Sequence, residues 1–238
     1  MEEKKVPKHI AFILDGNGRW AKKRFLPRNA GHAAGSKNVE KVCELAWNKG
    51  VKYVTMYAFS TENWSRPDSE VDALMNLLHV YVQDCMKKCK KNNMRVRFIG
   101  DLSKIRPDLV AEIRELEETS KIYTGLNLQI ALNYGGRDEI VRAVRKVCTE
   151  VKERDLNPED LKEADIEKYL DTADIPDPDL MIRTSGEQRL SNYLLWQLAY
   201  AEFYFTDVFW PDFGEKDLDL ALEYYANRDR RFGGLKNV

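Results

Sequence analysis

Residues 15–32 carry the first group of side chains that could bind a phosphate. The apolar run 9–14 ends at Asp15, which two glycines and an asparagine follow. A carboxylate at a strand end, next to backbone that a ligand can approach closely, suits a metal-bridged phosphate. Arg19, Arg28 and His32 come shortly after, and a predicted helix begins just beyond them, which adds cations and a helix N-terminus to the anion site. The same residues also fit an ordinary Asx–Gly turn with solvated arginines, and they match neither the dinucleotide-binding glycine pattern nor a P-loop.

A second group of polar side chains follows the apolar run 51–59. The segment 60–66 combines Trp64 and Arg66 with small polar residues. An aromatic ring beside a guanidinium can hold a ligand that is anionic at one end and apolar at the other. An equally good interpretation is a capped loop that leads into a helix at Pro67, where a proline costs little.

A third group lies in the segment 183–191, which follows a short predicted strand. Arg183 and Arg189 offer bidentate donors and the neighbouring threonine and serines offer hydroxyls, so the segment predicts a second phosphate cradle. Glu202 stands on the next predicted strand, as a functional carboxylate, a surface carboxylate or a salt-bridge partner of these arginines. Two anion cradles and one strand-end carboxylate together indicate two phosphorylated substrates around a hard cation.

The pattern of apolar residues predicts strands and helices that alternate along the chain. Short runs rich in β-branched and aromatic residues predict strands at 9–14, 51–59, 94–99, 126–132, 180–182 and 202–206. Three- and four-residue steps predict helices at 33–48, 67–89, 107–120, 137–153, 161–170 and 218–227, with a basic loop from 21 to 31. This alternation is typical of an α/β fold with a mainly parallel central sheet flanked by helices, whose ligands bind beyond the carboxyl ends of the strands. We expect one domain over residues 1–238.

Two further stretches have more than one interpretation. The apolar stripe from Val71 to Cys89 fits either plain core or the wall of an apolar tunnel. The basic cluster at 87–97 is suited to an anionic membrane surface, but a solvated helix end is the better interpretation.

The composition is that of an ordinary globular protein of 238 residues, with 43% hydrophobic and 32% charged residues. The 38 basic and 39 acidic residues nearly cancel, which argues against a general nucleic-acid binder. Cys43, Cys85, Cys89 and Cys148 form no CxxC pair, so we expect structural thiols in a reducing cytosol. The N-terminus lacks the apolar core of a secretory signal and no segment has the length to span a bilayer, so we expect a cytoplasmic chain, at most peripheral to a membrane.

The ordered motifs of the chain resemble the signatures of the cis-prenyltransferases, a family that includes the bacterial undecaprenyl diphosphate synthases. The first two are HIAFILDGNGRWA at 9–21 and RxxGH at 28–32. YAFSTENWSRP at 57–67 and LNYGGRDEI at 132–140 follow, and the last two are DLMIRTSGEQRLSNYLLWQLAYAEFYF at 179–205 and FWPDF at 209–213. The resemblance covers residues 9–234, and motifs of this length and order are far more specific than a short glycine pattern.

The resemblance implies an enzyme that condenses isopentenyl diphosphate units onto an allylic diphosphate, farnesyl diphosphate or a close relative, with Mg²⁺ as its cofactor. The implied product is a cis-polyprenyl diphosphate, undecaprenyl diphosphate, for a cell-wall lipid carrier. The implied fold encloses an apolar tunnel that sets product length, with the helix at 71–89, Leu126, Leu128 and Ile130 as candidate walls. A homodimer and a peripheral membrane contact for product release are also implied. The all-helical trans-prenyltransferases carry DDxxD motifs, which this sequence lacks.

The resemblance also assigns roles by position. Asp15 is implied to organise Mg²⁺ and the allylic diphosphate, Glu202 to be a metal ligand, and Asn63 to stand where the family places its proton acceptor. Because a neutral carboxamide is a poor base, we interpret Asn63 as a positioning residue, with diphosphate or water taking the proton. The implied substrate-binding residues are Gly16, Asn17, Gly18, Arg19, Arg28 and His32 in the allylic cradle, Trp20, Ser60, Thr61, Glu62, Trp64 and Arg66 in a substrate loop, and Arg183, Arg189, Leu190 and Ser191 in the isopentenyl cradle. The tail at 230–234 resembles a segment that reaches toward a partner's active site.

Two other functions compete with this interpretation. One is a non-catalytic partner subunit of the same fold, which would have lost residues of the catalytic set; the presence of Asp15, Asn63, Arg183 and Glu202 argues against it. The other is a phosphatase or nucleotide hydrolase, and the absence of a P-loop and of a cysteine-based phosphatase loop argues against that.

Overall fold

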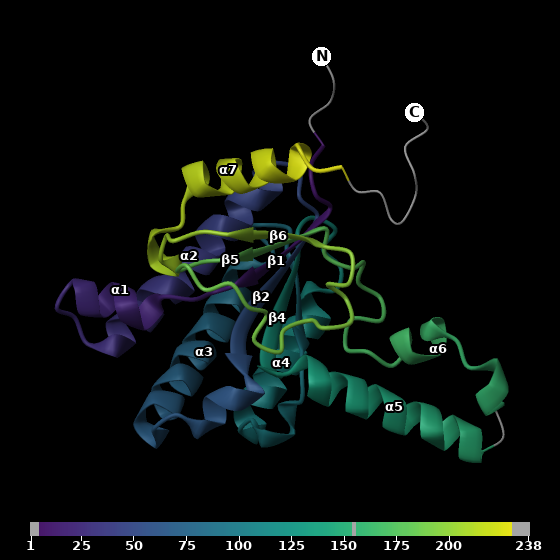
Figure 1. Ribbon diagram of the computed structural model, residues 1–238. Coiled ribbons are helices and arrows are strands. Elements are labelled where there is room, and N and C mark those ends of the chain that lie inside the picture. Colours follow the sequence, from purple (N-terminus) through teal and green to yellow (C-terminus); the bar gives the residue numbers. More distant parts are fainter. Residues whose placement is uncertain (1–4, 154–155, 230–238) are drawn as a thin grey trace, which may run out of the picture.

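The fold is built on a six-stranded sheet in which all neighbouring strands are parallel (Figure 1). The computed structural model describes residues 5–153 and 156–229. The strand order is β3-β4-β2-β1-β5-β6, and the strands are β1 His9–Ile13, β2 Tyr53–Ser60, β3 Arg95–Ile99, β4 Asn127–Tyr134, β5 Leu180–Arg183 and β6 Glu202–Phe205. The predicted α/β class is confirmed, and each predicted strand lies within two residues of an observed one at either end.

The strand order reverses beside β1, because the chain builds β2, β4 and β3 on one side of it and β5 and β6 on the other. Connections that leave such a point in opposite directions open a crevice at the carboxyl ends of the strands. The crevice lies here between the ends of β1 and β5, where Ile13 pairs with Arg183. The fold therefore places Asp15 and Arg183 at the position where parallel sheets bind ligands.

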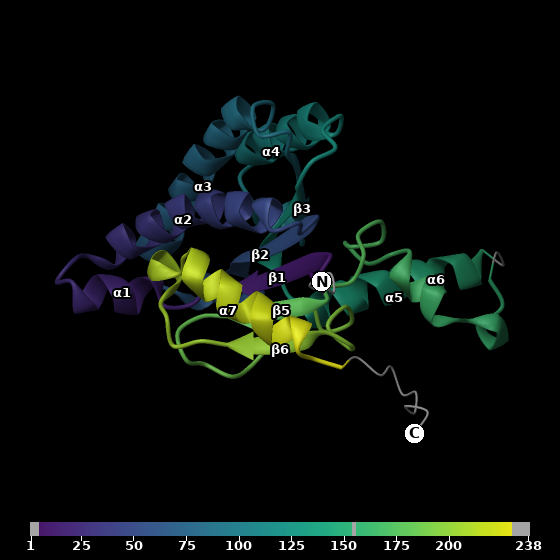
Figure 2. The same cartoon turned by 90° about the horizontal axis from the view of Figure 1, so that it is seen from above.

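Two apolar layers cover the sheet. The larger packs helices α2 Arg28–Asn48, α3 Asp68–Lys88, α4 Pro107–Ser120 and α7 Glu215–Ala226 on one face, and Figure 2 shows α2, α3 and α4 gathered on that side. The smaller covers the opposite face with Tyr193, Leu194 and Leu198, from the irregular segment after β5. Helices α5 Gly136–Lys152 and α6 Glu163–Glu167 reach away from the sheet (Figure 1).

The largest difference from the sequence-based prediction is in the segment that was predicted as a basic loop. It contains helix α1 Asn17–Lys23, and α2 begins at Arg28, five residues before the predicted start. Glycines allow these two helices to pack closely: a Cβ atom on Gly31 would lie 2.0 Å from the backbone oxygen of Asn17, and one on Gly35 would lie 2.1 Å from Asn17 Oδ1. The prediction was wrong because small and polar residues form this contact, and they leave no apolar stripe.

Smaller differences affect boundaries. Helix α6 has five residues where 161–170 was predicted, α7 begins at Glu215 instead of 218, and the predicted loop 60–66 contains a 3₁₀ helix at Thr61–Ser65. Cys43, Cys85 and Cys89 are buried free thiols, whereas Cys148 is exposed. Over residues 5–153 and 156–229, no helix combines the length and the hydropathy that a membrane span requires.

Candidate active site

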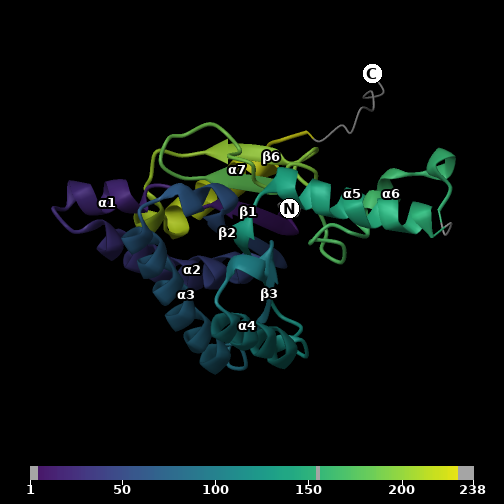
Figure 3. The same cartoon turned by 90° about the horizontal axis from the view of Figure 1, so that it is seen from below.

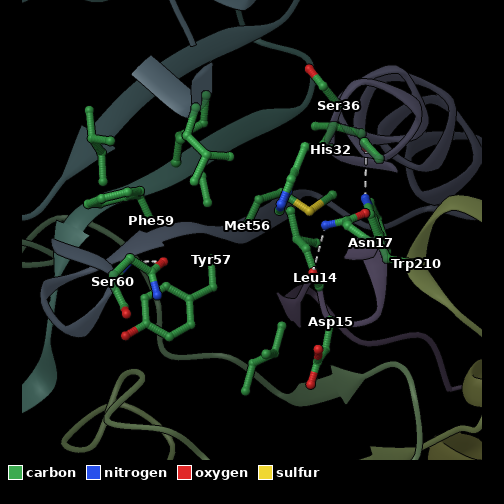
Figure 4. Close-up of a pocket in the computed structure, with 18 of the residues that line it drawn as sticks. Leu14, Asp15, Asn17, His32, Ser36, Met56, Tyr57, Phe59, Ser60 and Trp210 are labelled. Atoms are coloured by element: carbon green, nitrogen blue, oxygen red, sulfur yellow. Dashed lines mark hydrogen bonds between the residues drawn. The ribbon is translucent and has the colours of Figure 1, made fainter. Parts of the chain in front are cut away.

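The three segments singled out in the sequence converge on one cavity of about 380 Å³ at the carboxyl edge of the sheet. Asp15 and Asn17 lie on one side of it, and Tyr57 and Ser60 on the other (Figure 4). Of the predicted site residues, those that line the cavity are Asp15, Asn17, His32, Ser60, Asn63, Arg66, Arg183, Arg189 and Ser191. Three loops that are far apart in the sequence therefore form a common polar wall.

Asp15 is the carboxylate at the centre of this wall. Its Oδ2 accepts a hydrogen bond from Arg183 Nη2 at 3.0 Å, and its Oδ1 lies 3.2 Å from Arg19 Nη2. Oδ1 also accepts the backbone N–H of Gly16 at 2.7 Å, at a glycine whose φ of 99° is unfavourable for other residues. The Asp15 side chain keeps 28% of its surface exposed, so it can still meet a ligand.

Arg183 is the most deeply buried cation of the site, with 3% exposure. Its Nη1 donates to the backbone oxygen of Arg189 and to Ser191 Oγ, the latter at 2.9 Å. Within the described part of the chain, Arg183 Nε, Asn17 Oδ1 and Ser185 Oγ are buried and have no hydrogen-bond partner. Buried polar atoms are nearly always paired in folded proteins, and of these three only Arg183 and Asn17 belong to residues that line the cavity, where a polar ligand could complete them.

A second cationic group surrounds Glu70, at the beginning of α3. Glu70 Oε1 lies 3.0 Å from Arg28 Nε, 2.9 Å from Arg66 Nη1 and 3.6 Å from His32 Nε2. Burial lowers the pKa of His32, the attraction of Glu70 opposes this, and the nearby Arg66 and Arg28 lower it further. Glu70 was not among the predicted site residues. Glu70 stands four residues after Arg66, at the start of a predicted helix, and this spacing could have predicted an ion pair between the two side chains.

The substrate loop predicted at 60–66 is held to the neighbouring strand and to the third segment. Asn63 Oδ1 accepts the backbone N–H of Ser60 at 3.1 Å, and Trp64 Nε1 donates to Asn133 Oδ1 at 2.7 Å. Asn192 Nδ2 donates to Glu62 Oε1 at 2.8 Å, which connects this loop to the segment after Arg183. Glu62 and Thr61 lie outside the cavity lining, and Glu62 links two of its walls.

The remaining walls of the cavity are apolar. They come from β2, β4, α2 and α3, and consist of Met56, Phe59, Val39, Leu74, Met75, Leu78, Ile130 and Leu132 among others. Of the three strand residues predicted as tunnel walls, Ile130 lines this cavity; Leu126 lines an adjoining cavity of about 540 Å³ between α2 and α3, and Leu128 is fully buried core. The cavity is therefore cationic at the sheet edge and hydrocarbon-like behind it.

Several predicted residues lie apart from the cavity. Glu202 opens β6 level with Leu180 and Ile10, at the amino-terminal edge of the sheet, and pairs with Arg228 at 2.9 Å. It is therefore not adjacent to Asp15 within one chain. Trp20 Nε1 donates to Asp212 at 2.7 Å outside the cavity. The other predicted residues outside the cavity lining are Gly16, Gly18, Arg19, Arg28, Trp64 and Leu190. The tail 230–234 lies outside the described residues.

A family model and relatives of known type match this chain over nearly its whole length. The model described as "Putative undecaprenyl diphosphate synthase" matches residues 13–233. An isoprenyl transferase of Clostridium perfringens is 51% identical over 234 residues, which are 98% of this chain and 92% of that protein. A ditrans,polycis-undecaprenyl-diphosphate synthase ((2E,6E)-farnesyl-diphosphate specific) of Vibrio vulnificus is 49% identical over 228 residues, which are 96% of this chain and 91% of that protein.

A solved structure of a related enzyme has the same fold as this chain. Lavandulyl diphosphate synthase from Lavandula x intermedia, in complex with dimethylallyl diphosphate, superimposes with a TM-score of 0.92 at 40% identity, over 96% of this chain and 98% of that chain. The resemblance inferred from the motifs is thus confirmed: the chain belongs to the undecaprenyl diphosphate synthase family of prenyltransferases.

Proposed function

We propose that this chain adds isopentenyl diphosphate units, with cis double bonds, to farnesyl diphosphate or a close allylic relative, and so makes undecaprenyl diphosphate for a lipid carrier. The observation that carries the proposal is the division of one cavity into a cationic end and an apolar end. Arg66, Arg183 and Arg189 line the first, and Phe59, Leu78 and Ile130 line the second. A long prenyl diphosphate is likewise divided, because it has an anionic diphosphate at one end and a hydrocarbon chain at the other.

The two cradles have separate roles in this proposal. The group around Glu70, with Arg28 and Arg66, would receive the allylic diphosphate. The group around Arg183, with Arg189 and Ser191, would receive isopentenyl diphosphate. As the allylic C–O bond breaks, negative charge grows on the leaving diphosphate, and guanidinium and backbone N–H donors held in place stabilise it.

Bond formation follows from the alignment of the two substrates. The isopentenyl double bond attacks the allylic carbon, a new carbon–carbon bond forms, and a proton leaves to diphosphate or water. Asn63, whose Oδ1 is fixed by the Ser60 N–H at 3.1 Å, would position the reacting end of the substrate rather than take the proton. Each added unit moves further hydrocarbon into the apolar end of the cavity, which is worth about 0.8 kcal/mol per buried CH₂ group.

Asp15 is the residue that would hold Mg²⁺. Over the described residues, no cluster of three or more His, Cys, Asp or Glu side chains forms a metal cage. Mg²⁺ is commonly bound by one or two carboxylates together with substrate phosphates, and the partly exposed carboxylate of Asp15 between two anion cradles fits that mode. When bound, the ion would neutralise charge on the diphosphate.

The proposal includes one catalytic domain over residues 1–238, acting as a homodimer with peripheral membrane contact during product release. Because Glu202 opens β6 at the opposite sheet edge from Asp15, it could serve as a metal ligand only in the active site of a second copy of the chain.

Mixing inactive Asp15→Ala and Glu202→Ala subunits tests this role of Glu202, since a site shared between two subunits would recover activity in the mixed dimer. No recovery would remove Glu202 from the metal site.

Mass analysis of the extracted product tests the reaction itself. The protein is incubated with labelled isopentenyl diphosphate, farnesyl diphosphate and Mg²⁺, and products are extracted into an organic phase. We expect a labelled diphosphate lengthened by whole five-carbon units. Inorganic phosphate without a lengthened product would support a hydrolase, and no change in either substrate would support a non-catalytic partner subunit.

A further inference from the structure

The turn between α1 and α2 presents an apolar tip to solvent. Every residue from 22 to 29 is exposed, which makes this stretch, here called the Phe25 turn, a protruding part of the surface. Phe25 is 99% exposed and Leu26 is 44% exposed. Phe25 also has a φ of 56°, a left-handed conformation that is unusual for a bulky side chain. Exposed apolar residues are common one at a time, but a fully exposed aromatic ring in an unfavourable backbone conformation requires an explanation.

The Phe25 turn is rigidly built. The backbone N–H groups of Phe25 and Leu26 donate to the carbonyl oxygens of Lys22 and Ala21, at 3.2 and 2.9 Å. Arg24 donates to both carboxylate oxygens of Asp212, at 3.1 and 3.0 Å. The Arg24 guanidinium also lies 4.3 Å from the centre of the Trp20 ring. These contacts fix the turn, so the outward position of Phe25 is a defined feature of the fold.

The charge around the tip is positive. Lys22 and Lys23 are exposed on the last turn of α1 and form no ion pair with residues 5–153 or 156–229. The nearby carboxylate of Asp212 is already paired with Arg24. An aromatic and an aliphatic side chain next to two lysines without acidic partners is the combination that inserts into the headgroup region of an anionic bilayer.

The Phe25 turn lies at the same edge of the sheet as the cavity. Helix α1 follows Asp15 directly, and Arg28 begins α2 on the other side of the turn. Figures 1 and 3 show α1 and this turn projecting from the body of the molecule. A contact made here would bring the cationic end of the cavity toward a membrane surface.

We propose that the Phe25 turn docks this protein onto an anionic lipid bilayer, with Phe25 and Leu26 inserted among the headgroups and Lys22 and Lys23 over the lipid phosphates. This inference rests on the peripheral membrane contact in the proposed function. It assigns that contact to the Phe25 turn instead of the basic cluster 87–97. The contact needs no substrate, so it can be tested apart from catalysis.

Flotation with vesicles tests the proposal directly. The full chain is mixed, without substrate, with vesicles of phosphatidylcholine alone or with about one third phosphatidylglycerol. We expect binding to the anionic vesicles only, and a loss of about tenfold or more in apparent affinity for the double variant Phe25→Ser/Leu26→Ser. Lys22→Ser/Lys23→Ser should reduce binding and weaken its dependence on salt.

Ile122→Ser provides the matched control. Ile122 is a 76% exposed apolar residue beside Lys121, after α4 and toward the opposite edge of the sheet, and its replacement should leave vesicle binding unchanged. Equal binding by wild type and Phe25→Ser/Leu26→Ser would overturn the proposal. So would a shift from dimer to monomer in that variant with vesicle binding unchanged, which would assign the turn to contact between protein chains. Neither result would affect the proposed reaction, which is measured by product mass.

Discussion

The two edges of the sheet bury polar groups in opposite ways. At the amino-terminal edge, His9 is 1% exposed, and its Nδ1 donates to the Pro176 carbonyl at 2.6 Å while its Nε2 lies 2.7 Å from Thr55 Oγ1. At the carboxyl edge, the buried atoms Arg183 Nε and Asn17 Oδ1 have no hydrogen-bond partner within the described residues. A buried polar group with all its partners stabilises the fold, whereas one without them costs stability unless a ligand completes it.

Two histidines, one buried and one half-buried, show the same contrast. Burial lowers the pKa of both His9 and His32. His9 is fixed on both ring nitrogens by groups of the fold. His32 lies among Glu70, Arg28 and Arg66, and its Nε2 has no hydrogen bond within the described residues. A lowered pKa alone therefore does not distinguish the two histidines. Their positions do, because His32 lines the cavity and His9 does not.

Replacing Asp15 by Ala tests the carboxyl edge with the largest expected effect. Asp15 holds two arginines and is proposed to bind Mg²⁺, so turnover should fall by about 10³-fold or more. The protein should stay folded, because Asp15 follows a strand instead of filling the core, but the unfolding temperature should fall by several degrees, because the buried Arg183 guanidinium loses its carboxylate partner. Steady-state kinetics and thermal unfolding measure the two quantities. Full turnover at saturating Mg²⁺ would remove Asp15 from the mechanism.

Acid titration tests the amino-terminal edge, where stability should change instead of chemistry. The pKa of His9 falls from 6.5 to about 4 on folding, so the unfolded chain binds a proton more tightly than the folded chain does. The contribution of His9 to the free energy of unfolding should therefore fall by about 3 kcal/mol as the pH falls from about 6.5 to 4, and this contribution should not change further below pH 4. Urea unfolding at a series of pH values measures the slope.

Removing each histidine separately gives the control for that titration. His9→Asn should lower the stability at pH 7, because it breaks the contacts with Pro176 and Thr55, and should reduce the pH slope between 6.5 and 4. His32→Asn should change substrate binding more than the stability at pH 7. An unchanged pH slope in His9→Asn would show that other groups govern the acid sensitivity.

Arg28 and Arg189 test whether the carboxyl edge contains two independent cradles. Their side chains are 59% and 60% exposed and each pairs with one glutamate, so they are well matched for comparison. Arg28→Ala should raise the KM of the allylic diphosphate by about tenfold, and Arg189→Ala should raise the KM of isopentenyl diphosphate by a similar factor. Each should leave the other KM nearly unchanged. If both variants weaken the same substrate, the two-cradle arrangement is wrong.

Much of this arrangement could be predicted from the sequence. The apolar run that ends at Asp15 predicted both a buried strand and a carboxylate at its carboxyl end. The alternation of elements predicted a parallel sheet, and in such a sheet the loops after Asp15, Phe59 and Ile182 must meet at one edge. The convergence of three polar segments on one cavity was thus a consequence of topology.

The remaining features depend on packing that local patterns do not contain. Helix α1 has seven residues and contacts α2 through glycines, so no apolar periodicity marks it. The position of Glu202 is different, because Glu202 opens a predicted strand and Asp15 follows one, so in a parallel sheet the two residues lie at opposite edges. The role of Glu70 depends on the angle at which α3 meets α2, which brings Arg28 next to Arg66.

Glu70→Ala should have the smallest effect of these changes, and it determines whether the carboxyl edge is organised before substrate binds. Without Glu70, Arg28 and Arg66 lose the anion that fixes them, and ordering two free side chains costs affinity. The site also becomes more positive, which partly offsets this loss, so the KM of the allylic diphosphate should rise only by about threefold to fivefold. Glu70→Gln keeps an acceptor oxygen for the arginines and should recover part of the difference. A purely structural role would lower the unfolding temperature of both variants and change the KM of isopentenyl diphosphate equally, and that outcome would show that Glu70 belongs with His9 among the residues that only stabilise the fold.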